Sequence, residues 1–474
     1  MRKTLTGLVS LAVLAGTVTA AGAHTAGIED PAAPTGASAS ASASTSASGD
    51  ILARVLAIPG MRLIEEQPAP HHRFLILGFT QPVDHRNPDA GVFEQRFSLL
   101  HKDTGRPTVF HTSGYELMEG PVTAEPTEIV DGNQISLEHR FSPPSMPQPA
   151  DWSKLTIRQA ADDQHRLFTA LKKIYTKKWI ATGNSKGGMT ATFYERFHPD
   201  DMDGVVAYVA PNDVDNDEDS AYDRFFERVG TAEQRAGLRA LEREGLIRRE
   251  AMERRLAADA TAEGLTFTAV GSLGKAYEAV VREMSWNYWA APPAGGRPAL
   301  PDPAALTDQQ LYDTLNGIVK LSVFADQNFA DFAYEYQAGT ELGSPTRRTP
   351  AHLKGLTRYP HQQPRTFVPR EIPMTFKPKA MADVDRWVRD SARRMLFVNG
   401  AYDPWSAEPY RLGRGARDSA VLTAPGADHY AHIRDLNERD KALATAKLLR
   451  WAGVAPGAKR VAPDAPGAGQ NLPR

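Results

Sequence analysis

Residues 179–189 read Trp-Ile-Ala-Thr-Gly-Asn-Ser-Lys-Gly-Gly-Met, and this stretch decides the fold. The apolar residues 179–182 predict a buried strand, the pattern G-x-S-x-G follows at 183–187, and a helical pattern comes next. A serine in this strand–turn–helix context is held above the edge of a parallel sheet. Glycines are needed beside it because side chains would collide in so sharp a turn. The stretch therefore predicts that Ser185 is a nucleophile.

Short apolar runs alternate with helical patterns on both sides of this turn. Residues 74–79 and 92–100 predict an antiparallel pair of strands, and residues 155–175 predict a helix. Further strands are predicted at 108–111, 135–138, 205–209, 395–398 and 421–423, and a closing helix at 436–451. Such alternation is typical of a mostly parallel sheet with helices on both faces. Together with the turn at Ser185, it predicts an α/β-hydrolase fold.

Residues 215–385 do not continue this alternation of strands and helices, and they predict a mainly helical cap domain inserted into the sheet protein. They contain charged amphipathic helices such as the one predicted over 231–256, which opens with Thr231-x-x-Gln234 as a capping box. Asp403 lies 218 residues after Ser185, which is more than a few strand–helix units require, and the insertion accounts for the excess. The two predicted parts of the hydrolase domain are 50–214 and 386–453.

A serine nucleophile needs a base, and the base needs an orienting acid. In this fold the acid follows the serine in the chain and the histidine comes last. Asp403 lies in the loop after the predicted strand 395–398, which is the usual position of the acid. His429 and His432 both lie in the loop after the last predicted strand. The distance from that strand favours His429, and His432 is the alternative base.

The composition excludes several other classes of protein. The chain has 474 residues, with 55 Lys and Arg against 57 Asp and Glu, so no basic field points to nucleic acid or an anionic membrane. It has no cysteine, which excludes disulfides, thiol catalysis and Cys-type zinc sites. We expect no metal or other cofactor, no nucleic-acid or membrane partner, and a monomer.

The N-terminus predicts export. Arg2 and Lys3 precede an apolar run that ends at the cleavage pattern Ala21-Gly22-Ala23, so residues 1–23 are typical of a signal peptide. Residues 24–49 predict a low-complexity leader or pro-segment, and residues 454–474 a flexible tail. No other stretch approaches the length of a membrane-spanning helix. We therefore expect a secreted, extracellular protein.

Several segments of the chain resemble one family of serine peptidases. Residues 79–85 read Phe-Thr-Gln-Pro-Val-Asp-His, residues 138–141 read Glu-His-Arg-Phe, and Leu155-Thr156 is followed by Gln159-Ala160. The other matching segments are residues 183–189, Tyr336-Gln337, Thr340-Glu341-Leu342-Gly343, Asn399-Gly400 and Asp403-Pro404-Trp405-Ser406. Together they resemble the Pro-specific serine peptidases related to lysosomal prolyl carboxypeptidase and dipeptidyl peptidase II, in particular their secreted streptomycete branch of prolyl tri/tetrapeptidyl aminopeptidases.

This chain departs from the family's pattern in ways that bear on the site. The lysosomal members have cysteines that this chain lacks, and they carry an aromatic residue where Lys186 stands. Their histidine motif, A-H-x-x-D-L, matches Ala431-His432 with Asp435-Leu436. That alignment favours His432 over His429, so the identity of the base stays open.

The resemblance implies an exopeptidase that takes peptide or protein N-termini and prefers proline at the cleaved position. We expect it to release tri- or tetrapeptides through an acyl-enzyme formed on Ser185. A secreted esterase or lipase, or a non-catalytic binding protein, would share the fold and are the alternatives.

The same reaction requires groups that hold the oxyanion and the substrate. The backbone N–H of Lys186 and one from Gly114 or Tyr115, in the loop after residues 108–111, are expected to hold the oxyanion. A buried carboxylate is expected to bind the substrate's ammonium group. The candidates are Glu341 and Glu116 for that carboxylate, and Trp286, Trp289 and Trp405 for the walls of a proline pocket.

Two other patterns suggest metal sites, but each lacks a required part. Residues 213–219 read Asp-Val-Asp-Asn-Asp-Glu-Asp, yet the glycine and glutamate of a calcium loop are missing from their positions. We interpret this stretch as a solvated acidic loop that could line the site. His71-His72 has no third ligand near it and predicts a surface pair.

Overall fold

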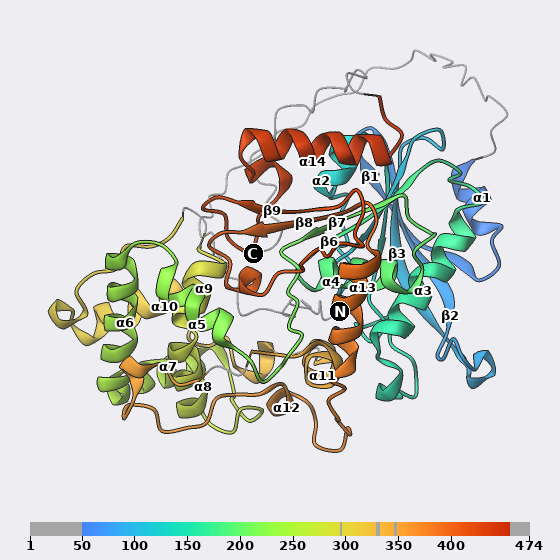
Figure 1. Cartoon of the computed structure of the whole chain (residues 1–474). Coiled ribbons are helices and arrows are strands. Elements are labelled where there is room, and N and C mark those ends of the chain that lie inside the picture. Colours follow the sequence, from blue (N-terminus) through green and yellow to red (C-terminus); the bar gives the residue numbers. More distant parts are fainter. Residues whose placement is uncertain (1–49, 294–295, 329–331, 346–347, 456–474) are drawn as a thin grey trace, which may run out of the picture.

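The computed structural model describes residues 50–293, 296–328, 332–345 and 348–455 (Figure 1). The predicted signal peptide (1–23), leader (24–49) and all but two residues of the predicted tail lie outside the described residues. One sheet has the strand order β1-β2-β3-β5-β4-β6-β7-β8-β9. Its strands are β1 (Met61–Ala69), β2 (His72–Pro82), β3 (Val92–His101), β4 (Thr108–Thr112), β5 (Asn133–Leu137), β6 (Trp179–Asn184), β7 (Gly204–Tyr208), β8 (Met395–Gly400) and β9 (Ala420–Ala424).

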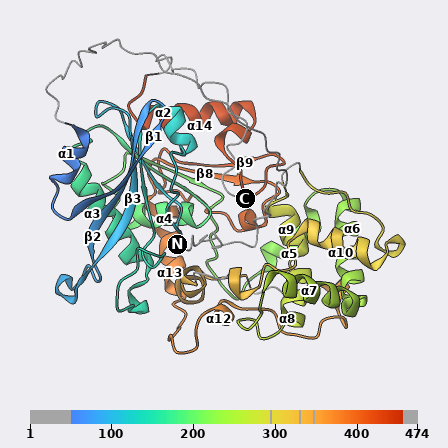
Figure 2. The same cartoon turned by 180° about the vertical axis from the view of Figure 1, so that it is seen from behind.

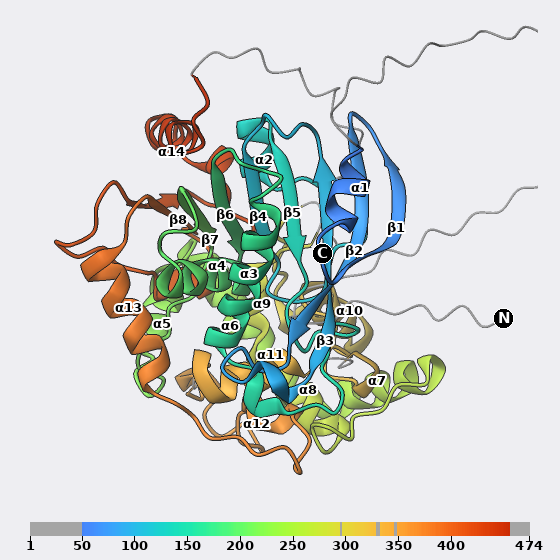
Figure 3. The same cartoon turned by 90° about the vertical axis from the view of Figure 1, so that its right-hand side faces the viewer.

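The first strands pair antiparallel and the rest pair parallel. β1 pairs with β2, β2 with β3, and β3 with β5 in antiparallel fashion, which confirms the predicted opening pair. From β5 through β4, β6, β7 and β8 to β9 every pairing is parallel. Figure 3 shows this order from β8 on one side to β1 on the other. This mostly parallel sheet, with the sharp turn at the end of β6, is the predicted α/β-hydrolase fold.

Helices cover both faces of the sheet because its central strands are apolar on both sides. Trp179 and Ala181 of β6 pack on one face, while Ile180 between them packs on the other. The first face is covered by α1 (Ile51–Leu56), α3 (Ile157–Leu171), α4 (Lys186–Phe197) and α13 (Lys379–Ser391). The second face is covered by α2 (Glu125–Val130) and α14 (Glu438–Trp451).

A group of helices between β7 and β8 lies to one side of the sheet (Figures 1 and 2). It has its own apolar core, which includes Leu241, Met252, Val281 and Leu311. The helices are α5 (Ser220–Arg228), α6 (Ala232–Ile247), α7 (Arg249–Glu263), α8 (Leu273–Arg282), α9 (Met284–Ala290), α10 (Asp308–Ile318), α11 (Ala333–Gln337) and α12 (Pro364–Phe367). No helix in the described part of the chain is both long and apolar enough to cross a bilayer.

Two details of the helical segment differ from the sequence-based expectation. The capping box of Thr231 and Gln234 is confirmed, but the single helix predicted over 231–256 is two helices, α6 and α7. The chain turns between them at Arg248, whose guanidinium donates to the Pro303 carbonyl at 2.7 Å and holds the turn closed. The predicted domain division at residue 385 falls inside α13, which packs against the sheet through Val384 and Val388.

The sequence analysis missed the first helix and the first strand. β1 is an edge strand with mostly exposed or half-exposed side chains, among them Glu65 and Glu66, so it lacks the apolar alternation that marks a buried strand. It pairs with β2 through most of its length. An edge position also accommodates Pro68, which cannot donate a ladder hydrogen bond.

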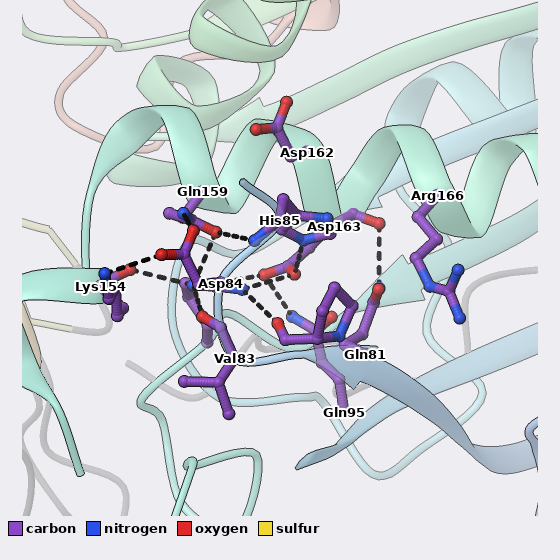
Figure 4. Close-up of polar contacts among 12 residues, drawn as sticks. Gln81, Val83, Asp84, His85, Gln95, Lys154, Gln159, Asp162, Asp163 and Arg166 are labelled. Carbon is purple, nitrogen blue, oxygen red and sulfur yellow. Dashed lines mark hydrogen bonds and ion pairs between the residues drawn. The ribbon is translucent and has the colours of Figure 1, made fainter. Parts of the chain in front are cut away.

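A buried ion pair between Arg140 and Asp163 connects three of the motif segments, and Figure 4 shows Asp163 with its neighbours His85 and Gln95. Arg140 donates to Asp163 through Nε to Oδ2 at 2.6 Å and through Nη2 to Oδ1 at 2.8 Å. Both side chains are almost completely buried. His85 Nε2 lies 2.7 Å from Asp163 Oδ1, and Arg140 also donates to the Lys154 carbonyl at 2.9 Å.

A second carboxylate, Asp84, extends this network. It accepts hydrogen bonds from Lys154 Nζ at 2.7 Å and from Gln159 Nε2 at 2.6 Å. The hydrogen bond from Lys154 holds the pKa of Asp84 well below its usual range. Hydrogen bonds of the motifs at 79–85, 138–141 and 155–160 therefore connect β2, the loop after β5 and α3. Their polar side chains bond one another and hold these elements in place.

Candidate active site

Ser185 occupies a strained turn between β6 and α4. Its backbone has φ 55° and ψ −125°, and its N–H donates to the Tyr208 carbonyl at 2.9 Å. A Cβ added to Gly183 or to Gly187 would collide with the carbonyl oxygen of Thr112. The glycines of the motif are therefore required by the close approach of the β4 end. A strained backbone of this kind is held in place by the structure around it and exposes the serine hydroxyl.

The structure brings Ser185, His429 and Asp403 together in one hydrogen-bonded row. His429 Nε2 lies 2.8 Å from Ser185 Oγ, and His429 Nδ1 lies 3.0 Å from Asp403 Oδ1. Asp403 is fully buried, and His429 is 6% exposed. The carboxylate can therefore orient the imidazole and stabilise its charged form, as a base next to a serine nucleophile requires.

Asp403 has further partners that fix its orientation. Ser406 Oγ donates to Oδ2 at 2.6 Å, and the Trp405 backbone N–H donates to Oδ1 at 3.0 Å. The segment Asp403-Pro404-Trp405-Ser406 therefore carries the acid and the donors that hold it. The sequence analysis quoted Ser406 only as part of a motif, although an acid that accepts the N–H two residues later, as Asp403 does, is a common pattern in turns.

His432, the alternative base, faces a different set of partners. Its Nδ1 lies 2.6 Å from the Tyr430 carbonyl, and its Nε2 lies 3.4 Å from Asn184 Nδ2. Burial lowers the pKa of His432, which favours the neutral ring. The geometry favours His429 as the base, because its two ring nitrogens face the serine and the acid.

Glu125 anchors the loop that carries both histidines, and the sequence analysis missed it. Its carboxylate accepts hydrogen bonds from the backbone N–H groups of Ile433 and Arg434, at 2.8 and 2.9 Å. The Tyr208 hydroxyl donates to the same carboxylate at 2.8 Å. Glu125 is buried although no motif marks it, so only the three-dimensional contacts reveal its role.

The predicted oxyanion loop lies against the residue that follows the nucleophile. Lys186 is 3% exposed, its Nζ donates to the Gly114 carbonyl at 2.5 Å, and it lies 4.8 Å from the centre of the Tyr115 ring. The Gly114 N–H donates to Thr112 Oγ1 at 3.1 Å and the Tyr115 N–H to Ser113 Oγ at 3.0 Å. Both N–H groups therefore already have an acceptor within the loop, and their binding of an oxyanion stays a prediction.

The loop after β5 supports the oxyanion loop from the other side. The His139 N–H donates to the Tyr115 carbonyl at 2.8 Å. Burial, together with the nearby charge of Lys186, holds the pKa of His139 well below its usual range. Because Arg140 follows His139, the buried ion pair of Arg140 and Asp163 is connected to the oxyanion loop through one residue.

The two predicted ammonium ligands lie in different surroundings. Glu341 is 6% exposed, and it already has two partners: the Ile157 N–H donates to Oε2 at 2.8 Å, and Lys377 Nζ lies 3.0 Å from Oε1. It therefore caps the first turn of α3. Glu116 is half-buried in the oxyanion loop. Their binding of substrate stays a prediction.

The predicted tryptophans gather beside His429. The ring centres of Trp405 and His429 are 6.2 Å apart, and those of Trp405 and Trp286 are 4.8 Å apart. Trp289 is 1% exposed and packs on Tyr402 at 5.3 Å. The His429 N–H donates to the carbonyl of Ala290 at 2.9 Å, so α9 touches the loop of the base. Their contact with proline stays a prediction.

One group of His and Asp side chains in the described part of the chain has the spacing of metal ligands. His165, His198 and Asp201 offer atoms within 4.8 Å of one another. The two imidazole rings are stacked at 4.1 Å with an angle of 7° between their planes. Ring nitrogens bind a metal in the plane of the ring, and two nearly parallel planes share no such point. These residues do not fit a metal site.

Comparisons with known proteins place the chain in a family. The chain matches the family described as PS-10 peptidase S37 over residues 44–472. A prolyl tri/tetrapeptidyl aminopeptidase of Streptomyces mobaraensis is 52% identical to it over 460 residues, which cover 96% of this chain and 93% of the relative.

Solved structures give weaker likenesses. A proline iminopeptidase of Mycobacterium smegmatis aligns with a TM-score of 0.35 and 16% identity over 82% of this chain and 98% of that one. An α/β fold family hydrolase of Bacillus anthracis aligns with a TM-score of 0.33 and 11% identity over 79% and 99%. Neither likeness bears on function, and the fold assignment rests on the sheet topology. The match over most of the chain and the identity to the streptomycete relative show that the chain belongs to the PS-10 peptidase S37 family.

Proposed function

We propose that this serine peptidase releases tri- or tetrapeptides from free peptide N-termini, with proline preferred at the cleaved position. The hydrogen-bonded row of Ser185, His429 and Asp403 carries the proposal. The 52% identity to the prolyl tri/tetrapeptidyl aminopeptidase of Streptomyces mobaraensis supports the substrate class. The predicted signal peptide supports release of the enzyme from the cell.

Ser185 and His429 form the acyl-enzyme in two steps. Ser185 Oγ attacks the carbonyl carbon of the cleaved bond while His429 Nε2 takes the hydroxyl proton. The carbonyl oxygen becomes an oxyanion, which the Lys186 N–H and one N–H of the Gly114–Tyr115 loop bind. The intermediate then expels the amine, which receives the proton from His429 Nε2. The peptide remains as an ester on Ser185.

Water completes the cycle by the same route. His429 Nε2 takes a proton from water, and the hydroxide attacks the ester carbonyl. When this intermediate collapses, His429 gives the proton to Ser185 Oγ, and the short peptide leaves as a carboxylic acid that loses its remaining proton to solvent. Asp403 holds the imidazole in the tautomer that keeps Nε2 free to accept, because Nδ1 donates to Oδ1.

The test uses Ala-Ala-Pro-p-nitroanilide with a free amine and its N-succinylated form. The proposal expects rapid release of p-nitroaniline from the free form only. Ser185→Ala is expected to lose turnover while keeping the melting temperature of the wild type, and the wild type is expected to react with a fluorophosphonate at Ser185. Cleavage of both substrates would contradict the aminopeptidase assignment. Cleavage of simple esters alone would identify an esterase.

A further inference from the structure

Asp213 and Glu408 lie at the edge of the sheet that carries the proposed triad. Asp213 follows β7, which lies between β6, with Ser185 at its end, and β8, which leads to Asp403. Glu408 belongs to the loop that begins at Asp403. The Asn212 N–H donates to the Glu408 carbonyl at 3.0 Å, so the two loops are joined beside the site.

Among the described residues, neither carboxylate has a hydrogen-bond or ion-pair partner. Asp213 is 5% exposed. Gly343 packs so closely that an added Cβ would lie 2.7 Å from Asp213 Oδ2. Burying a carboxylate without a partner costs free energy, and such groups are normally paired. Glu341, in contrast, already has two partners.

The charges around these two groups are mainly negative. Burial and the neighbouring carboxylates of Glu408 and Asp219 raise the pKa of Asp213 to about 7. Burial and Asp219 likewise raise the pKa of Glu408 to about 7, and Arg411 opposes this rise. Asp215 adds to the repulsion at both. A positive charge placed between the two carboxylates would therefore bind favourably.

The arrangement does not suit a metal ion. Across the described residues, no three carboxylates of residues 213–219 and Glu408 bring their oxygens within 4.8 Å of one another. Ca²⁺ requires about six to eight oxygen ligands at roughly 2.3–2.6 Å. An ammonium group has three N–H donors and is satisfied by two or three acceptors. An ammonium group therefore suits the two carboxylates better than a metal ion does.

A row of aromatic rings leads from the base to this acidic region. The ring centres of His429 and Trp405 are 6.2 Å apart, those of Trp405 and Trp286 are 4.8 Å apart, and those of Trp286 and Tyr222 are 5.4 Å apart. Tyr222 lies in the first turn of α5, which begins after Asp219. An extended peptide advances about 3.4 Å per residue, so the amine of a tripeptide ends roughly 10 Å from the cleaved bond.

We propose that Asp213 and Glu408 bind the free α-ammonium group of the peptide substrate. The inference rests on the proposed function and specifies its N-terminal binding site. A carboxylate pair at a fixed distance from Ser185 holds the amine, and the residues between them are held along Trp405. The distance between the pair and Ser185 then sets the length of the released peptide. A blocked N-terminus offers no charge to this pair and is rejected.

The test compares Asp213→Asn, Glu408→Gln and the control Asp217→Asn with the wild type. Asp217 lies in the same acidic loop and is exposed, so its variant removes the same charge without touching the proposed site. The substrates are Ala-Ala-Pro-p-nitroanilide and its N-acetyl form. We expect Asp213→Asn and Glu408→Gln each to lower kcat/KM for the free-amine substrate about 10- to 100-fold, mainly through KM. The slow rate on the acetylated substrate stays unchanged, and Asp217→Asn stays within about twofold of the wild type.

Each result decides between the two proposals. If the wild type cleaves only the free-amine substrate and both variants keep its preference for that substrate, this inference fails while the proposed function stands. An equal loss in Asp217→Asn would mean a general effect of charge and would also overturn it. Activity that EDTA removes and Ca²⁺ restores would assign the carboxylates to a metal. If the wild type cleaves neither substrate, both proposals fail together.

Discussion

Lys186 Nζ donates a hydrogen bond to the Gly114 carbonyl at 2.5 Å, so the residue after the nucleophile holds the loop that faces it. The two segments are far apart in the sequence, and a buried cation joins them. We expect this contact to fix the distance between the two predicted oxyanion donors.

Replacing Lys186 with methionine tests that role. The variant keeps the backbone N–H and an apolar stem but loses the ammonium group. We expect kcat to fall about 10- to 100-fold, because a small displacement of a group that binds the transition state has effects of this size, while KM changes little. Steady-state kinetics on the free-amine tripeptide substrate measure both constants. A rise in KM with unchanged kcat would place Lys186 in substrate binding instead.

The two histidines of the last loop give a matched pair of variants. We expect His429→Ala to lower kcat by about 10⁴-fold or more, because this ring faces both the serine and the acid. His432→Asn is expected to keep kcat within about tenfold, since His432 contacts Asn184 and the Tyr430 carbonyl. Turnover of the same substrate measures both variants. The opposite order of effects would make His432 the base.

Asp163 and Asp162 are neighbours on α3 with opposite surroundings (Figure 4). Asp163 pairs with buried Arg140, whereas Asp162 points away from that network and pairs with Arg158 and His198 near the surface. Asp163→Asn should lower the free energy of unfolding by about 3–5 kcal/mol, because it leaves Arg140 buried without its partner. Asp162→Asn should cost about 1 kcal/mol or less. Urea denaturation compares them, and equal losses would contradict the prediction.

The unpaired carboxylate of Asp213 predicts a pH-dependent stability. Its pKa is about 7 in the folded protein, against about 3.9 in an unfolded chain. The folded state therefore binds the proton more tightly, and the wild type loses stability as the pH rises from about 4 to above 7. Asp213→Asn does not ionise, so we expect its melting temperature to exceed that of the wild type by a few degrees at pH 8 and by less at pH 5. A difference that does not change with pH would contradict this reading.

The sequence could predict the features that arise from local pattern. The strand, glycines and helix around Ser185 fix the turn, and the order of the serine, the acid and the histidine follows from the fold. The choice between His429 and His432 was different, because both lie in one loop and only the contacts with Asp403 and Ser185 separate them. Glu125 and Ser406 act through hydrogen bonds to that loop and to the acid, and no spacing marks them.

Two other features depend on contacts between residues far apart in the sequence, which local sequence patterns do not indicate. The helix predicted over 231–256 divides at Arg248 because its guanidinium is held by the distant Pro303 carbonyl. Asp213 looked like a member of a solvated loop, since six of its seven residues are polar or charged. The packing of Gly343 and the approach of the Glu408 loop distinguish it from the exposed Asp217, four residues later in the sequence.

The order of the strands determines when the proposed active site can form during synthesis of the chain. β8 and β9 complete the sheet beside β7, and they lead to Asp403 and His429. In the chain, the helical segment separates β7 from β8. A nascent chain that has produced Ser185, its strained turn and the cap still has no base for the serine. We therefore expect peptide hydrolysis to begin only when the final strands have been synthesised and docked, and a chain that ends before β8 to be inactive.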